Sequence, residues 1–92
     1  MAWYSSTNIF VIRRQRMSEQ EWLDIFGDNL ISMLNDANMS QSELAEETDI
    51  SQGTISKYTR GQQLPGIKAI INISYALDCD VSELIDFGDR II

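Results

Sequence analysis

Hydrophobic residues after position 17 recur at spacings of three and four, which is the pattern of amphipathic helices. The first series predicts a helix from Glu19 to about Asn38, begun by a capping box of Ser18 and Glu21. Its apolar positions are Trp22, Phe26, Leu30, Met33, Leu34 and Ala37. Gly27 falls inside this pattern, where a glycine costs about 1 kcal/mol relative to alanine. We therefore expect Gly27 to be a point where the helix can divide into a short lead-in and a main helix.

Two shorter helices are predicted next in the chain. Ser40 is placed as the N-cap of a helix over Gln41–Thr48, because a capping-box glutamate follows it three residues later. Ser51 is the N-cap of another, from Gln52 to about Arg60, which ends at Gly61. Only a tight connection separates the two helices.

Two further helices complete the predicted domain. A strongly apolar one follows Pro65 and spans about Ile67 to Leu77. Asp80, with a glutamate three residues later, predicts a last helix from Val81 to about Phe87. The fold class is therefore all-α, with five helices over residues 17–87 and a short tail over 88–92.

Residues 1–16 differ in character from this helical region. They contain β-prone residues, and we interpret Asn8–Arg13 as a short strand or extended arm. A single strand has no partner in its own chain, so it either packs on the surface or pairs with the same strand of a second subunit. Its end is basic, with Arg13, Arg14 and Arg16. These arginines form either a flexible tip or an arm that contacts DNA. Met17 is a candidate alternative translation start, which would make residues 1–16 an extension outside the core domain.

The composition excludes several kinds of metal site, cross-link and catalytic site. Its 92 residues suffice for one small domain, and no apolar run is long enough for a membrane span or a signal peptide. There is no His and only one Cys, Cys79, so a zinc site, an intramolecular disulfide and a Ser-His or Cys-His nucleophile pair are all excluded. We predict a cytoplasmic protein that is not an enzyme and needs no metal or cofactor, with Cys79 serving the core rather than redox sensing.

The chain is acidic overall, but its charged residues are unevenly distributed. A net charge of −7 argues against unspecific binding to nucleic acid or to an anionic membrane. Residues 50–77 nevertheless contain no Asp or Glu, where an even distribution would place about four. With Lys57, Arg60 and Lys68 this segment carries +3, and the rest of the chain carries −10. We therefore expect one cationic patch on an otherwise anionic molecule. Such a patch suits an anionic partner that binds at this place.

The two short helices have the arrangement of a helix-turn-helix, whose second helix enters the major groove of DNA. At 100° per residue, Ile55 and Tyr58 share one side of the second helix. The opposite arc is uncharged or basic and holds Gln52, Gly53, Ser56, Lys57 and Arg60. A face without carboxylates is what groove reading requires, because a carboxylate there would meet phosphate.

Four segments in order resemble the phage repressor/Cro family of helix-turn-helix domains, also called XRE-type. They are Met39–Ala45, Ile50–Tyr58, Arg60–Pro65 and Ala76–Ile85. The resemblance covers about two thirds of the chain and implies a DNA-binding fold with a recognition helix over residues 52–60.

Some positions depart from the pattern of that family. Asp49 stands where the family usually has a glycine in the turn, and we expect it to adopt the left-handed conformation. Gln62 and Gln63 replace a basic pair, and Arg60 replaces a common asparagine. Gly53 truncates a position that often reads a base, so the protein either allows close backbone approach there or reads less sequence.

The resemblance also implies the contact residues. The implied base contacts are Ser51, Gln52, Thr54 and Lys57. The implied phosphate contacts are Gln41, Ser56, Arg60, Gln62 and Gln63. Tyr58 is expected to pack in the core rather than to contact phosphate, and Trp22 and Phe26 are expected on the core face of the first helix.

These observations favour a sequence-specific transcriptional regulator that binds double-stranded DNA as a homodimer. The candidate dimer contacts are Ile9–Ile12 and the apolar residues Phe87, Ile91 and Ile92. The main alternative is a protein-interaction module, similar to an antitoxin or antirepressor, that binds a protein partner through the acidic face. One test distinguishes the two hypotheses. Replacing Gln52 and Lys57 with alanine abolishes specific DNA binding if the protein is a regulator, and it leaves a role in protein binding nearly intact.

Overall fold

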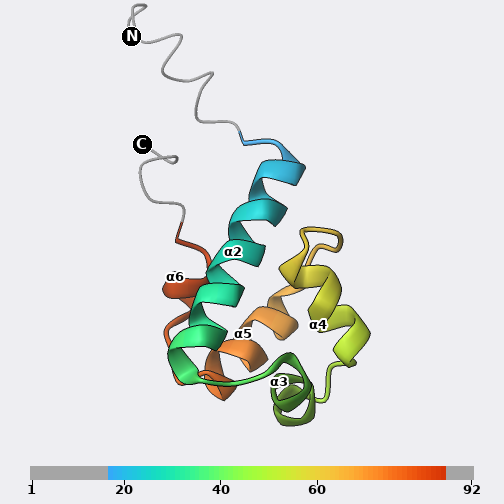
Figure 1. Ribbon diagram of the computed structural model, residues 1–92. Helices are drawn as coiled ribbons and strands as arrows, with labels where there is room; N and C mark the ends of the chain where they lie inside the picture. The colour runs from blue at the N-terminus through green and yellow to red at the C-terminus, as the bar shows by residue number, and fades with distance from the viewer. Residues whose placement is uncertain (1–16, 87–92) are drawn as a thin grey trace, which may run out of the picture.

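The computed structural model describes residues 17–86, and this part of the chain contains helices and turns but no strand. The helices are α2 (Glu19–Ala37), α3 (Gln41–Thr48), α4 (Gln52–Thr59), α5 (Ile67–Ala76) and α6 (Val81–Leu84), shown in Figure 1. The predicted all-α, five-helix fold is confirmed. The predicted arm over residues 1–16 and the tail over 88–92 lie outside the described residues.

Reciprocal capping boxes begin the first two helices, as the sequence predicts. Ser18 Oγ accepts a hydrogen bond from the Glu21 N–H at 3.1 Å, and Glu21 Oε1 accepts one from the Ser18 N–H at 3.0 Å. Ser40 and Glu43 repeat this exchange at 3.0 and 2.8 Å. Each box satisfies backbone donors that would otherwise be unpaired at a helix start.

Two predicted helix limits were wrong. Gly27 does not divide α2, which is continuous over 19 residues, because Gly27 is buried against another helix. Helix α6 ends at Leu84 rather than near Phe87. Asn29 of α2 explains this end, because its Nδ2 donates to the carbonyl oxygens of Leu84, at 2.8 Å, and Asp86, at 3.0 Å. A side chain thus binds the terminal carbonyls, which a longer helix would pair with its own N–H groups.

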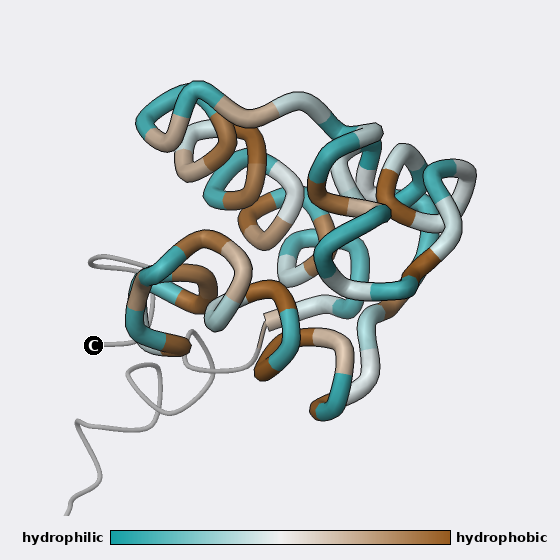
Figure 2. The backbone as a smooth tube through the Cα atoms, turned by 90° about the horizontal axis from the view of Figure 1, so that it is seen from below, coloured by the Kyte–Doolittle hydropathy of each residue, from teal (hydrophilic) through white to brown (hydrophobic). Residues whose placement is uncertain are grey.

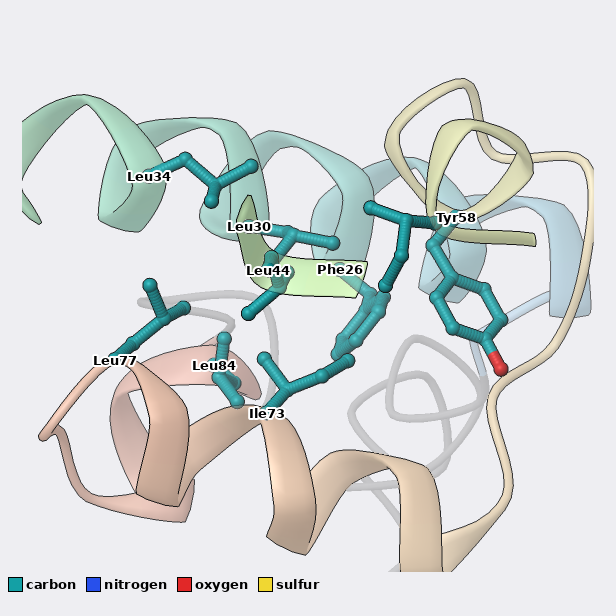
Figure 3. Packing of buried hydrophobic residues seen from close by; sticks show 9 residues of the cluster. Phe26, Leu30, Leu34, Leu44, Tyr58, Ile73, Leu77 and Leu84 are labelled. Carbon is teal, nitrogen blue, oxygen red and sulfur yellow. The ribbon is translucent and has the colours of Figure 1, made fainter. Parts of the chain in front are cut away.

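A single hydrophobic cluster holds the helices together (Figure 3). Every described helix contributes to it, with Phe26, Leu30, Leu34, Leu44, Ile55, Tyr58, Ile73, Leu77 and Leu84. Six of these side chains are fully buried, and each fully buried side chain of this size contributes about 1.5–3 kcal/mol. Figure 2 shows hydrophilic and hydrophobic positions interleaved along the helices, and each described helix has both buried and exposed residues.

Helix α2 is the support on which the others are arranged. It contacts α4 and α6, which lie on opposite sides of it in Figure 1. Helix α3 contacts α4 and α5, and α5 also contacts α6. This packing buries one side of α3 and α4 and leaves their other sides exposed.

Candidate nucleic-acid interface

The turn between α3 and α4 is fixed by two neighbouring residues. Asp49 has φ 61° and ψ 24°, so the predicted left-handed conformation is confirmed. The buried hydroxyl of Thr48 donates to the Leu44 carbonyl at 2.7 Å and accepts from the Ile50 N–H at 3.3 Å. Together they make a tight corner, which sets the angle at which α4 leaves α3.

Helix α4 has one buried side and one exposed side. Ile55 is fully buried and Tyr58 is 5% exposed, which confirms the predicted inner face. The Tyr58 ring meets Phe26 edge to face at 6.0 Å, and burial raises the pKa of its hydroxyl above the ordinary value. Gln52, Gly53 and Lys57 are exposed on the outer side.

The N-terminus of α4 is capped without a carboxylate. Ser51 Oγ accepts from the Thr54 N–H at 3.1 Å and donates to Thr54 Oγ1 at 2.8 Å. Thr54 occupies the position that Glu21 and Glu43 occupy in the capping boxes of α2 and α3. The positive end of the helix dipole is therefore not offset by any acidic residue in the first turn of α4.

Helix α2 fixes the C-terminal end of α4 by backbone contact. A Cβ atom on Gly27 would lie 2.8 Å from the Tyr58 carbonyl oxygen and 2.9 Å from that of Thr59. Only a glycine lets the two helices approach this closely. Trp22 stacks on Phe26 at 5.5 Å, so aromatic rings extend the same contact toward the start of α2.

A second contact from α2 holds the turn after α4. Gly61 has φ 68°, a conformation that favours glycine. Gln20 Nε2 donates to the Gly61 carbonyl oxygen at 3.0 Å and to Asp24 Oδ1 at 2.9 Å. Because both ends of α4 are anchored, its exposed side has a fixed orientation.

The predicted contact residues lie at the start of α3, along α4 and in the loop after α4, and none of them is buried. Gln52 and Lys57 are exposed, and their side chains make no hydrogen bond within residues 17–86, so these side-chain polar groups are available to a ligand. Ser51 and Thr54 lie at the start of α4, where the Ser51 hydroxyl is engaged by the cap. Gln41 is half-buried at the first position of α3.

Three of the predicted phosphate-contact residues form a small network. The Arg60 guanidinium donates to Ser56 Oγ at 2.7 Å through Nη1 and to Gln62 Oε1 at 3.3 Å through Nε. Ser56 and Gln62 hold the guanidinium at the end of α4, where Arg60 remains exposed. Gln63 is exposed in the loop that follows.

Gly53 has no structural reason to be a glycine. A Cβ atom there would meet no atom within 4 Å, and its φ is not positive. The residue is exposed in the first turn of α4 and gives that turn a bare backbone surface.

Sequence reasoning missed the residues that position this surface, namely Gln20, Asp24 and Gly27. Their partners lie in α4 or the turn after it, so no local pattern marks them, although a glycine inside a helical pattern was a signal for a close contact. Cys79 is half-buried beside the core, as expected. Burial, followed by the charges of Glu83, Asp80 and Asp78, raises the pKa of its thiol.

Two further properties bear on the class of protein. Within residues 17–86, no three His, Cys, Asp or Glu side chains come together as metal ligands would. None of the helices in this part of the chain has the length and apolar character needed to cross a membrane.

Known proteins share this architecture. Residues 30–84 match the family model HTH_3, described as helix-turn-helix. The crystal structure of an HTH_3 family transcriptional regulator from Vibrio cholerae is similar, with a TM-score of 0.70 and 18% sequence identity. The match covers 73% of this chain and 38% of that chain, so this chain corresponds to less than half of that protein. No curated protein sequence matches the chain.

Proposed function

The chain belongs to the HTH_3 family of helix-turn-helix domains, and from this premise we propose that it is a sequence-specific DNA-binding transcriptional regulator of the repressor/Cro kind. The family assignment agrees with the resemblance drawn from its motifs and with the expectation that it is not an enzyme. One observation carries the proposal beyond the family. The exposed side of α4 has no acidic group, and Thr54 stands three residues after its N-cap Ser51, where the capping boxes of α2 and α3 have glutamate.

We assign base reading to the exposed side of α4. Gln52 lies at the first position of the helix. Its amide NH₂ can donate to adenine N7 while its amide oxygen accepts from the adenine N6 amino group, which is the bidentate pairing of glutamine with adenine. Lys57 donates to guanine O6 or N7, and Ser51 and Thr54 contact the flanks.

Phosphate contacts frame this reading surface. Gln41 stands at the N-terminus of α3, where backbone N–H groups and the helix dipole favour an anion. At the other end, Arg60 is held by Ser56 and Gln62, so its guanidinium is ordered before DNA arrives. Gln63 extends the contact along the backbone.

We further propose that the regulator acts in the cytoplasm as a homodimer on a palindromic operator. A module of this size contacts one half-site and has modest affinity alone. Two copies related by a two-fold axis place their recognition helices in successive major grooves, about 34 Å apart.

The test is selection of bound sequences from a pool of random duplexes at two salt concentrations. An enriched, two-fold symmetric site whose affinity falls with salt supports the proposal. The double variant Gln52→Ala, Lys57→Ala then loses specific binding. Ser82→Ala, which removes an exposed hydroxyl from α6 on the other side of α2, is the matched control and keeps it. If no sequence is enriched at low salt, the proposal fails.

One observation favours a second candidate function, a protein-interaction module of the antitoxin or antirepressor type. Outside residues 50–77 the chain carries −10, a charge suited to a basic protein partner. A protein partner bound through this acidic face would still be bound by the double variant Gln52→Ala, Lys57→Ala, whereas operator DNA would not.

A further inference from the structure

Helix α5 exposes an unusual row of large apolar side chains. Ile67, Ile71 and Tyr75 follow one another at intervals of four residues and are therefore neighbours along one side of the helix. They are 78%, 37% and 79% exposed, and Leu64, just before the helix, is 54% exposed. We call these four residues the α5 row.

The α5 row is large enough to matter energetically. The exposed parts of its side chains amount to roughly 450 Å², comparable with the largest apolar patch of a typical monomer, and such patches mark interaction sites. Two such surfaces facing each other cover about twice this area, close to the roughly 1,000 Å² that a specific interface requires.

We propose that the α5 row is the surface on which a second copy of this chain docks, with the two α5 helices antiparallel. In this arrangement Ile71 of each copy lies near the two-fold axis, and Ile67 of one copy meets Tyr75 of the other. Because the interface is isologous, one self-complementary row serves both copies. A row at intervals of four is also the ridge that packs between helices in the commonest crossing geometry.

Charge favours a second copy as the occupant. A chain of net charge −7 repels its own copies, and α5 belongs to the segment of residues 50–77 that contains no acid. The helix itself carries one charged residue, Lys68, in its first turn. Near its other end, Glu47 lines a hollow together with Tyr75, whereas Asp49 lines both this hollow and a neighbouring one that includes Lys68. Antiparallel docking directs each Lys68 toward Glu47 of the other copy.

This inference rests on the proposed function in one respect, because a palindromic operator requires two copies. It assigns the dimer contact to a surface other than Ile9–Ile12 or the residues around Phe87. The α5 row also adjoins the loop that follows α4, so the dimer contact lies close to the DNA-reading helix in the chain.

The test is the oligomeric state of the full chain by sedimentation equilibrium. Ile71→Lys places a charge at the axis and is expected to weaken dimerisation by more than about tenfold. Ile31→Lys is the matched control, since Ile31 is 41% exposed on α2 and lies outside the row. Tyr75→Lys provides a second variant at a position too exposed to support the core, and circular dichroism checks that each variant folds.

The expected result is a wild-type dimer, a dimeric Ile31→Lys variant, and monomeric Ile71→Lys and Tyr75→Lys variants. A monomeric wild type, or row variants that dimerise like the wild type, overturns the inference. Binding to a duplex with a single half-site tests DNA binding separately from the proposed dimer contact. Monomeric variants that still bind a half-site but lose the advantage of the full palindrome support both. If the wild type binds no DNA but the Ile71→Lys and Tyr75→Lys variants become monomeric, the dimer contact is supported and the proposed function is not.

Discussion

Gly27 of α2 lies so close to the backbone of Tyr58 in α4 that a Cβ atom on Gly27 would stand 2.8 Å from the Tyr58 carbonyl oxygen. Real Cβ atoms do not approach carbonyl oxygens this closely, so the contact exists only because residue 27 has no side chain. It joins the supporting helix to the proposed DNA-reading helix, and the aromatic contact of Phe26 with Tyr58 lies beside it. The orientation of α4 therefore depends on a residue outside the helix-turn-helix.

Gly27→Ala is expected to destabilise the protein by about 1–3 kcal/mol, because α2 and α4 must separate to admit the methyl group. Helix propensity alone predicts the opposite sign, a gain of about 1 kcal/mol. The midpoint of urea unfolding decides between them. A rise in the midpoint would mean that the contact is looser than described.

Gly53→Ala is the matched substitution and is expected to stabilise the fold by about 0.5–1 kcal/mol, because the new methyl group meets no atom. If DNA approaches the bare backbone of this turn, the same variant binds its operator more weakly despite its greater stability. Urea unfolding and an operator titration measure the two effects separately. Unchanged DNA affinity would favour the other interpretation, that this position reads no base.

Thr54→Glu is expected to separate stability from function more sharply. A glutamate at this position completes a capping box with Ser51 like those at Ser18 and Ser40, and it retains or slightly raises stability. It also places a carboxylate on the proposed DNA-binding side, so operator binding should be lost. Thr54→Gln, which supplies the cap without the charge, serves as control. Full operator binding by Thr54→Glu would contradict the assignment of this surface.

Arg60→Ala is expected to weaken binding by a similar factor on all sequences, because a phosphate contact carries no base information. The slope of the logarithm of affinity against the logarithm of salt concentration should fall by about one. Lys57→Ala should instead relax preference at one base pair. Affinities measured on matched and mismatched duplexes at several salt concentrations distinguish the two patterns.

Cys79 leads to a pH prediction. Because the pKa of its thiol is raised in the folded state, mainly by burial, the folded protein keeps this proton to a higher pH than the unfolded chain. Its contribution to stability is complete below the pKa of the unfolded thiol and is lost as the pH rises toward the folded one. The difference in unfolding midpoint between wild type and Cys79→Ala should therefore fall at alkaline pH. Alkylation should also be slower in the folded protein than after unfolding.

Helix starts and the sides of α4 were predictable because their causes are local. Ser18 and Ser40 cap through residues three positions away, and Ile55 and Tyr58 share a face by helical spacing. The left-handed Asp49 followed from comparing the turn with the family pattern. These features belong to short stretches of sequence, so a single chain suffices to recognise them.

The errors and omissions arose where distant residues decide the outcome. Spacing cannot tell whether Gly27 breaks a helix or admits a neighbouring one. The end of α6 depends on Asn29, which is 55 residues from Leu84 in sequence. In the strongly apolar α5, periodicity did not reveal that Ile67 and Tyr75 remain exposed. The base and phosphate contacts stay predictions, because they depend on a molecule outside the chain.

The local capping boxes also bear on how fast the chain folds. Each forms between residues three apart, so it is available before any distant contact is made. Short-range closure of this kind favours transient helices in the unfolded ensemble and places small helical domains among the microsecond-to-millisecond folders. Folding of this domain is therefore expected to add little delay after synthesis.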